Sequence, residues 1–252
     1  MATNIYTAPD YTSQKEQLLR LVKKFDTEGE LIVKGSRNII KSNFIYSEKV
    51  NIKYFKKPNF FNALIYRFVR PSKAKRSFDY ALYLLKNHIL TPAPVAYIEN
   101  TAAGLADSYY ICKHIDYDFT FRELIHDPLF KNREIILRQF TAFTFKMHES
   151  SVNFLDHSPG NTLIVDKKDG TYDFYLIDLN RMRFQSLSVE QRMDNFKKLW
   201  LSKTMVKIIA EEYAVLSGEP YEKLYTILLQ KTLGFKKKIT RKKYLKRKLK
   251  KK

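Results

Sequence analysis

The pattern of hydrophobic residues changes near residue 116, and this change limits the folds open to the chain. Before it, short segments rich in Ile, Val, Phe and Tyr alternate with polar breaks, which is typical of antiparallel strands. The predicted strands span 30–35, 37–46, 49–55, 94–100 and 108–115, and one amphipathic helix spans 72–88. Beyond residue 116, apolar residues recur at helical spacing over 132–151, 198–216 and 221–233. We therefore expect an α+β fold with a strand-rich N-terminal lobe and a helical C-terminal lobe.

The composition is that of a globular protein. A chain of 252 residues with 44% hydrophobic content can bury a large core. Its longest uninterrupted apolar run, 80–85, is far shorter than the roughly 18 residues needed for a membrane span. The N-terminal residues lack the basic and apolar parts of a secretory signal, and the single cysteine excludes an internal disulfide. We therefore predict a cytoplasmic protein.

Positive charge is concentrated at the C-terminus. The formal net charge is +20, and residues 235–252 contain twelve Lys or Arg and no acidic residue. We therefore divide the chain into an N-terminal lobe (1–115), a C-terminal lobe (116–234) and a basic segment (235–252). Such a run is typical of an arm that binds anionic partners, although a solvated end is the simpler alternative. An anionic membrane surface is the favoured partner, because the aromatic and glycine pattern of a common RNA-binding module is missing.

The stretch "VNFLDHSPGN" (152–161) carries the first candidate site. Its composition alone is that of an ordinary turn. However, Asp156 and Asn161 are five residues apart, which is the spacing of the base and a metal ligand in a kinase catalytic loop. Asp178 follows the apolar end of a strand, after a hairpin turn at 167–170. Lys53 lies in "VNIK", which has the form of the phosphate-pairing strand lysine.

Phosphoryl transfer requires these residue types together. A cation binds the nucleotide phosphates, carboxylate and amide oxygens hold magnesium, and a further carboxylate orients the attacking hydroxyl. Taken singly, Lys53 could be a solvated strand residue and Asp178 could begin a turn. Their order along the chain favours a kinase, with Lys53 for the phosphates, Asp156 as base, and Asn161 and Asp178 as magnesium ligands.

These residues, together with "RPSKAKRSFDYALYLLKNHILTPAPVAYIE" (70–99), resemble the lipopolysaccharide kinases, the Kdo and heptose kinase group. The resemblance spans residues 34–184 and implies a two-lobed protein-kinase-like fold, with ATP and Mg²⁺ in the cleft. It also implies that the acceptor is a sugar hydroxyl of the inner core linked to lipid A. The enzyme would then act as a peripheral protein at the inner face of the cytoplasmic membrane.

The chain departs from this family in several places. Phe154 stands where related kinases have a histidine that braces the loop, so Phe154 must brace it by packing. Asn180 replaces the glycine of Asp-Phe-Gly, and Asn tolerates a positive φ better than most residues. Gly35 is the lone glycine of the predicted phosphate-covering loop. Asp79 is the nearest carboxylate to the position that should pair with Lys53.

The predicted acceptor is small. Only nine residues separate Asp178 from the predicted helix cap at Ser188, which is too few for the activation segment that supports a peptide. Arg181 and Arg183 could contact an anionic sugar such as Kdo, or brace the local backbone. We expect phosphorylation of a core sugar, with no protein partner. The alternatives are another small-molecule or RIO-like kinase, and a non-catalytic pseudokinase or basic binding protein.

Overall fold

The computed structural model describes residues 2–36, 38–56, 70–102 and 104–249. The chain divides into two compact units, unit 1 over Met1–Asp116 and unit 2 over Tyr117–Lys252.

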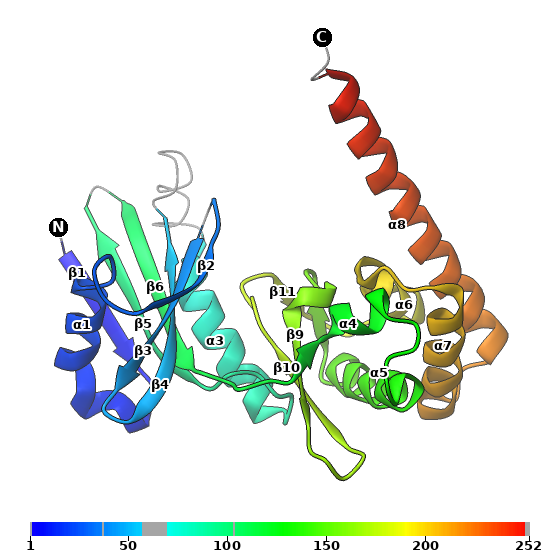
Figure 1. Ribbon diagram of the computed structural model, residues 1–252, viewed down its shortest axis with the longest axis horizontal. Coiled ribbons are helices and arrows are strands. Elements are labelled where there is room, and N and C mark those ends of the chain that lie inside the picture. The colour runs from blue at the N-terminus through cyan, green and yellow to red at the C-terminus, as the bar shows by residue number, and fades with distance from the viewer. Residues whose placement is uncertain (1, 37, 57–69, 103, 250–252) are drawn as a thin grey trace. The chain divides into compact units, whose positions relative to one another are not determined.

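Unit 1 is built on one antiparallel sheet with strand order β1-β5-β6-β4-β3-β2 (Figure 1). Its strands are β1 (Ala2–Thr7), β2 (Glu30–Lys34), β3 (Asn38–Ile45), β4 (Glu48–Phe55), β5 (Pro94–Thr101) and β6 (Leu105–Lys113). The five predicted strands are confirmed, and the first three form the expected meander. Strand β1, the 3-10 helix η1 (Pro9–Gln14) and helix α1 (Lys15–Lys23) are further elements that the sequence pattern did not indicate.

The two faces of this sheet are covered by different helical segments. Phe25, just beyond α1, packs on Tyr54 and Tyr109, which lie opposite each other in β4 and β6. On the other face, Phe78 of α3 (Lys73–Lys86) packs on Tyr97 of β5. Because side chains alternate along a strand, the register places Lys53 on the α3 face, opposite Tyr110 and in line with Tyr97.

Helix α3 begins and faces inward for reasons visible in the sequence. Ser72 caps it, its side-chain oxygen accepting from the Lys75 N–H at 3.0 Å. Ala74, Phe78 and Ala81 recur on one side of the helix and are buried against the sheet.

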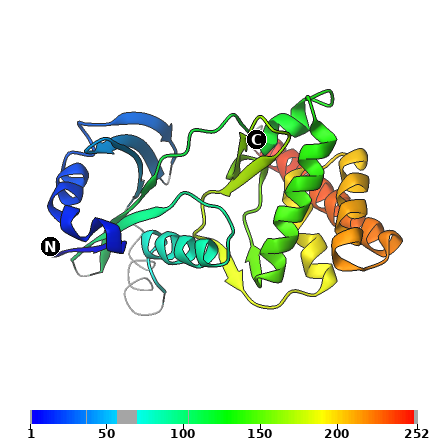
Figure 2. The ribbon, with the colours of Figure 1, turned by 90° about the horizontal axis from the view of Figure 1, so that it is seen from below.

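Unit 2 combines helices with two small sheets. Strands β10 (Tyr172–Leu176), β9 (Thr162–Asp166) and β7 (Phe119–Thr120) form one sheet, and β11 (Met182–Phe184) pairs with β8 (Val152–Phe154). The helical segments are α4 (Phe121–His126), α5 (Arg133–Glu149), η2 (Pro159–Asn161), α6 (Val189–Asn195), η3 (Phe196–Leu199), α7 (Lys203–Ser217) and α8 (Tyr221–Leu249). Helix α7 packs against both α5 and α8, and apolar side chains of these helices form the core of the unit. Figure 2 shows the three helices in a second view of the ribbon.

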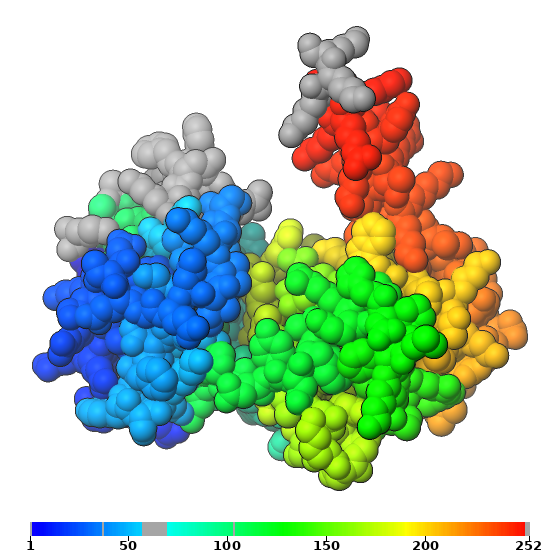
Figure 3. Space-filling model, viewed as in Figure 1, coloured from blue at the N-terminus to red at the C-terminus, as the bar shows by residue number. Residues whose placement is uncertain are grey.

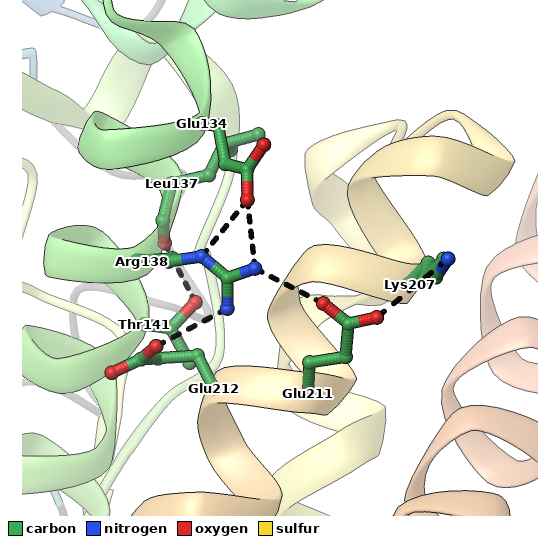
Figure 4. A network of polar contacts seen from close by, with 7 residues as sticks. All are labelled: Glu134, Leu137, Arg138, Thr141, Lys207, Glu211 and Glu212. Atoms are coloured by element: carbon green, nitrogen blue, oxygen red, sulfur yellow. Dashed lines mark hydrogen bonds and ion pairs between the residues drawn. The ribbon is translucent and has the colours of Figure 1, made fainter.

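A network of charged side chains joins α5 to α7 at the surface (Figure 4). Arg138 of α5 pairs with Glu134 on its own helix at 2.7 Å, and with Glu211 and Glu212 of α7 at 3.1 and 3.4 Å. Lys207 extends the network to Glu211 at 3.8 Å. Partly exposed ion pairs contribute little individually, so the apolar contacts beneath them dominate the stability of this packing.

Two predicted helices differ from the structure. The expected helix 198–216 is divided, because Trp200 adopts a left-handed conformation with φ 61°. Ser202 then caps α7 by accepting from the Met205 N–H at 3.3 Å. The helix expected over 221–233 instead continues to Leu249, so the described part of the basic segment is the end of α8. Among the described residues, no helix is long and apolar enough to cross a membrane.

Candidate functional site

The stretch 152–161 forms a short strand, a turn and a single 3-10 turn, all within unit 2. Strand β8 follows α5 directly and pairs with β11, and the Leu155 N–H donates to the Arg181 carbonyl at 3.0 Å. Asp156 lies in the turn just beyond, with its side chain 27% exposed. The carboxylate that the sequence predicts as the base is therefore accessible and held at the end of a paired strand.

Two cations surround the Asp156 carboxylate. Lys198 of η3 donates from Nζ to Asp156 Oδ1 at 3.0 Å and to the Leu155 carbonyl at 2.5 Å. The Arg181 guanidinium lies 3.7 Å from Asp156 Oδ2, and its side chain is 61% exposed. Lys198 is thus fixed by two acceptors of the loop, whereas Arg181 is the more accessible charge. The chemistry of the site combines a carboxylate with positive charge beside it.

The predicted metal ligands lie on adjoining backbone. Asn161 ends η2, and its carbonyl accepts from the Ile177 N–H at 3.0 Å, one residue before Asp178. The Asn161 Nδ2 donates to the Asp156 carbonyl at 2.8 Å. This bond uses the nitrogen end of the amide, so the oxygen end faces elsewhere as an acceptor. One amide oxygen and one carboxylate, completed by phosphate oxygens and water, form a donor set that suits Mg²⁺.

The turn after β10 places the positive φ on a different residue from the one expected. Asp178 itself is left-handed, with φ 58°, and Asn180 is not among the positive-φ residues. Aspartate is one of the few residues that tolerate this region, because its short side chain can bond locally. Asn180 Nδ2 donates to Asp178 Oδ1 at 2.6 Å and is nearly buried. Asn180 therefore orients the Asp178 carboxylate, and the positive φ of this turn lies at Asp178 and not at Asn180.

A buried amide holds the loop at 152–161 in place. Asn195, at the end of α6, donates from Nδ2 to the Phe154 carbonyl and to Asn153 Oδ1, both at 2.9 Å. Its Oδ1 accepts from His157 Nδ1 at 2.9 Å and from His148 Nε2 at 3.3 Å. Phe154 is fully buried, as its predicted packing role requires. The hydrogen-bonded bracing comes in addition from Asn195 and from His157, one residue after Asp156.

This network determines the state of both histidines. The Phe154 carbonyl can only accept a hydrogen bond, so Asn195 Nδ2 must face it and Asn195 Oδ1 must face the two histidines. The histidine ring nitrogens that contact this oxygen are therefore donors. His148 Nδ1 must then accept from the Tyr213 hydroxyl at 2.9 Å. Burial lowers the pKa of His148 to about 3 and of His157 to about 4, and it raises the pKa of Tyr213 to about 12. All three groups are therefore neutral near pH 7.

The nucleotide-binding residues predicted from the sequence lie in unit 1. Lys53 is 9% exposed on β4, and its ammonium lies 5.4 Å from the centre of the Phe55 ring. Gly35 follows β2 in the loop toward β3, and its backbone N–H donates to the Asn38 carbonyl at 2.9 Å. Asp79 of α3 pairs with Lys75, one turn earlier, at 3.0 Å. The roles of Lys53, Gly35 and Asp79 in nucleotide binding stay predictions.

Sequence reasoning missed Lys198 and Asn195. Lys198 reaches Asp156 from a position 42 residues later in the chain, and Asn195 reaches the Phe154 carbonyl from 41 residues later. The capping box of α6, with Ser188 as the cap and Gln191 at its third position, was visible in the sequence. A capping box predicts where α6 begins, but it does not predict that the last residue of α6, Asn195, contacts the loop at 152–161.

Comparison with known proteins supports the fold. The chain is similar to a solved structure described as WaaP in complex with acyl carrier protein, with 12% identity and a TM-score of 0.65. The alignment covers 94% of this chain and 98% of the other. The two chains share a mixed α/β fold. No protein-family model and no curated protein sequence matches the chain. The predicted resemblance is therefore supported at the level of the fold alone.

Proposed function

We propose that the protein is an ATP-dependent kinase that phosphorylates a sugar hydroxyl, with Kdo of the lipid A-linked inner core as the acceptor. The loop that joins Asp156 to Asn161 carries this proposal, because its braced carboxylate and oriented amide lie beside the fixed cation of Lys198. The fold shared with WaaP supports a phosphotransferase of this class.

Asp156 would orient the acceptor hydroxyl and accept its proton as the bond to phosphorus forms. Lys198 lies beside that carboxylate at 3.0 Å, so it would also lie beside the phosphoryl group at the moment of transfer. A fixed positive charge at this place stabilises the negative charge that develops on the phosphoryl oxygens. Lys198 therefore supplies the electrostatic part of the site and Asp156 the proton acceptor.

Asn161 and Asp178 would hold Mg²⁺ through their side-chain oxygens. The metal, when bound, neutralises charge on the β- and γ-phosphates of ATP. The Asn161–Asp156 and Asn180–Asp178 hydrogen bonds orient the two ligands before a metal arrives. In unit 1, Lys53 would pair with the phosphates of the nucleotide. Gly35 would lie in the loop that covers these phosphates, and Asp79 would orient Lys53.

A small anionic acceptor fits the segment that follows Asp178. Strand β11 begins at Met182 and α6 is capped at Ser188, so almost no chain is left to support a peptide. Arg181 is exposed and lies beside Asp156, where its guanidinium can bind the carboxylate of an acidic sugar. Arg183 is also exposed on β11. These two charges favour an acidic sugar over a neutral one.

The test is incubation with ATP and magnesium and a panel of acceptors, followed by mass spectrometry. The panel contains Kdo-lipid A, heptosylated lipid A, free Kdo, an aminoglycoside and a generic protein. We expect phosphate on the Kdo acceptors. Phosphate on the aminoglycoside alone would indicate a different small-molecule kinase, and phosphate on none, without nucleotide binding, would refute the enzyme.

Asp156→Asn tests the proposed proton acceptor in the same experiment. The variant keeps the shape of the side chain but cannot accept the proton, so turnover should fall at least about a hundredfold while ATP binding is unchanged. Asp173→Asn is the matched control, because Asp173 lies on β10 and pairs with Lys167 at 3.5 Å. Near-normal turnover of Asp156→Asn would remove Asp156 from its proposed role.

A further inference from the structure

The last part of α8 is an exposed basic helix. From Lys237 to Leu249, every residue except Ile239 is exposed. Figure 3 shows this end of α8, in red, projecting from the rest of unit 2. Residues 235–249 include nine Lys or Arg and no acid. A helix of this length extends about 22 Å, long enough to present several charges at once to one surface.

This helix is attached to unit 2 along one side only. The Phe235 ring packs against Trp200 with ring centres 5.9 Å apart, and Lys243 Nζ lies 5.9 Å from the centre of the Trp200 ring. Lys236 Nζ donates to the Leu201 carbonyl at 2.8 Å. These contacts fix the direction of α8 and leave its other sides available.

A different side carries leucines among cations. Lys238, Arg241, Leu245 and Leu249 follow one another at intervals of three, four and four residues, so they share one side of the helix. Together with Gly234, Lys237, Lys242 and Lys246 they line one shallow surface hollow, which we call the docking face. Leu245 is 48% exposed and Leu249 is 74% exposed. Exposed leucines flanked by Lys and Arg match helices that lie in a membrane interface.

We propose that the docking face of α8 binds the surface of an anionic lipid bilayer. The cations would contact lipid phosphates, and Leu245 and Leu249 would enter the boundary between headgroups and acyl chains. A bilayer fits this face better than RNA does, because its apolar residues are leucines and not the aromatic rings on which bases stack. Its use to the cell rests on the proposed function, since it would hold the enzyme at the inner face of the membrane beside a lipid-linked acceptor.

The experiment measures binding of the full chain to vesicles of phosphatidylcholine with about a third phosphatidylglycerol, and to phosphatidylcholine alone. We expect binding to the anionic vesicles only, falling steeply as salt is raised. Lys238→Gln/Arg241→Gln/Lys242→Gln should bind at least about tenfold more weakly. Leu245→Gln/Leu249→Gln should bind several-fold more weakly and keep the salt dependence.

The matched control is Lys131→Gln/Lys203→Gln/Lys207→Gln, which removes three exposed cations from other parts of unit 2. It should bind as the wild type does. Equal losses in both triple variants would overturn the docking face, as would strong binding to neutral vesicles. Tight binding to single-stranded RNA or to a soluble acidic protein, without binding to anionic vesicles, would also overturn it.

These outcomes are separable from the fate of the proposed function, because the vesicles contain no acceptor. Vesicle binding without kinase activity would leave the docking face standing and refute the kinase. Activity on soluble Kdo without vesicle binding would support the kinase and refute the docking face. Activity of the α8 triple variant on soluble Kdo should equal that of the wild type.

Discussion

Replacing Asn195 by alanine should strongly destabilise unit 2. The side chain makes four hydrogen bonds, and its removal leaves the N–H groups of His148 and His157 buried without that acceptor. The Phe154 carbonyl keeps the hydrogen bond from the backbone N–H of His157 at 3.2 Å, but it loses the one from the Asn195 side chain. A buried donor left without a partner costs about 1–3 kcal/mol, so two of them cost about 2–6 kcal/mol. This is a large fraction of a typical total of about 5–15 kcal/mol.

The assay is urea unfolding followed by tryptophan fluorescence. Trp200 is the single tryptophan of the chain and lies in unit 2, so its signal reports on the unit that contains Asn195. Gln185→Ala is the control, because Gln185 is exposed in the same unit and its loss should change stability by less than about 0.5 kcal/mol.

A loss below about 1 kcal/mol in Asn195→Ala would refute the reasoning. It would mean that the histidines find other partners, or that the four hydrogen bonds contribute little together. Turnover provides a second readout, measured in the absence of urea at a temperature where the variant is folded. Because Asn195 braces the loop that carries Asp156, turnover should fall while nucleotide binding remains.

Three further predictions concern the site and its pH dependence. Lys198→Met should lower turnover about 10²–10³-fold with unchanged ATP binding, whereas its neighbour Lys197→Met, which loses only a pair with Asp194, should not. Asp178→Asn should weaken magnesium-dependent nucleotide binding measured by calorimetry; an effect on acceptor affinity alone would contradict its role as ligand. Since burial holds the folded pKa of His148 and His157 below that of the unfolded chain, unfolding takes up protons as pH falls below about 6.5. Stability by Trp200 fluorescence should drop by about 2 kcal/mol per histidine between pH 7.5 and 5.0, and a flat profile would refute the buried neutral state.

Structural features that depend on neighbours in the chain were predictable from the sequence. Strands β2 to β6 and helix α3 follow from the spacing of apolar residues, and the Ser188 cap of α6 follows from a local hydrogen-bond pattern. The Asp156-to-Asn161 spacing is also local, because one turn holds both residues.

The N-terminal elements show where local pattern fails. Strand β1 is largely exposed and has little alternation of its own; it is a strand because it pairs with β5, with Tyr6 opposite Tyr97. Such pairing depends on a partner some 90 residues away in the sequence. Likewise, the break at Trp200 and the continuation of α8 reflect packing around the Trp200 ring, which no local periodicity encodes.

The sequence alone therefore determined which residue types meet in the loop at 152–161 and that a basic segment follows unit 2. Only the tertiary structure decided which partners hold that loop. Lys198 and Asn195 reach it because α6 packs against β8 and η3 follows α6 directly, and their spacing in the chain has no periodic relation to Asp156. The structure also decided that the basic segment is a helix with leucines on a defined side, because that helix is attached at Trp200.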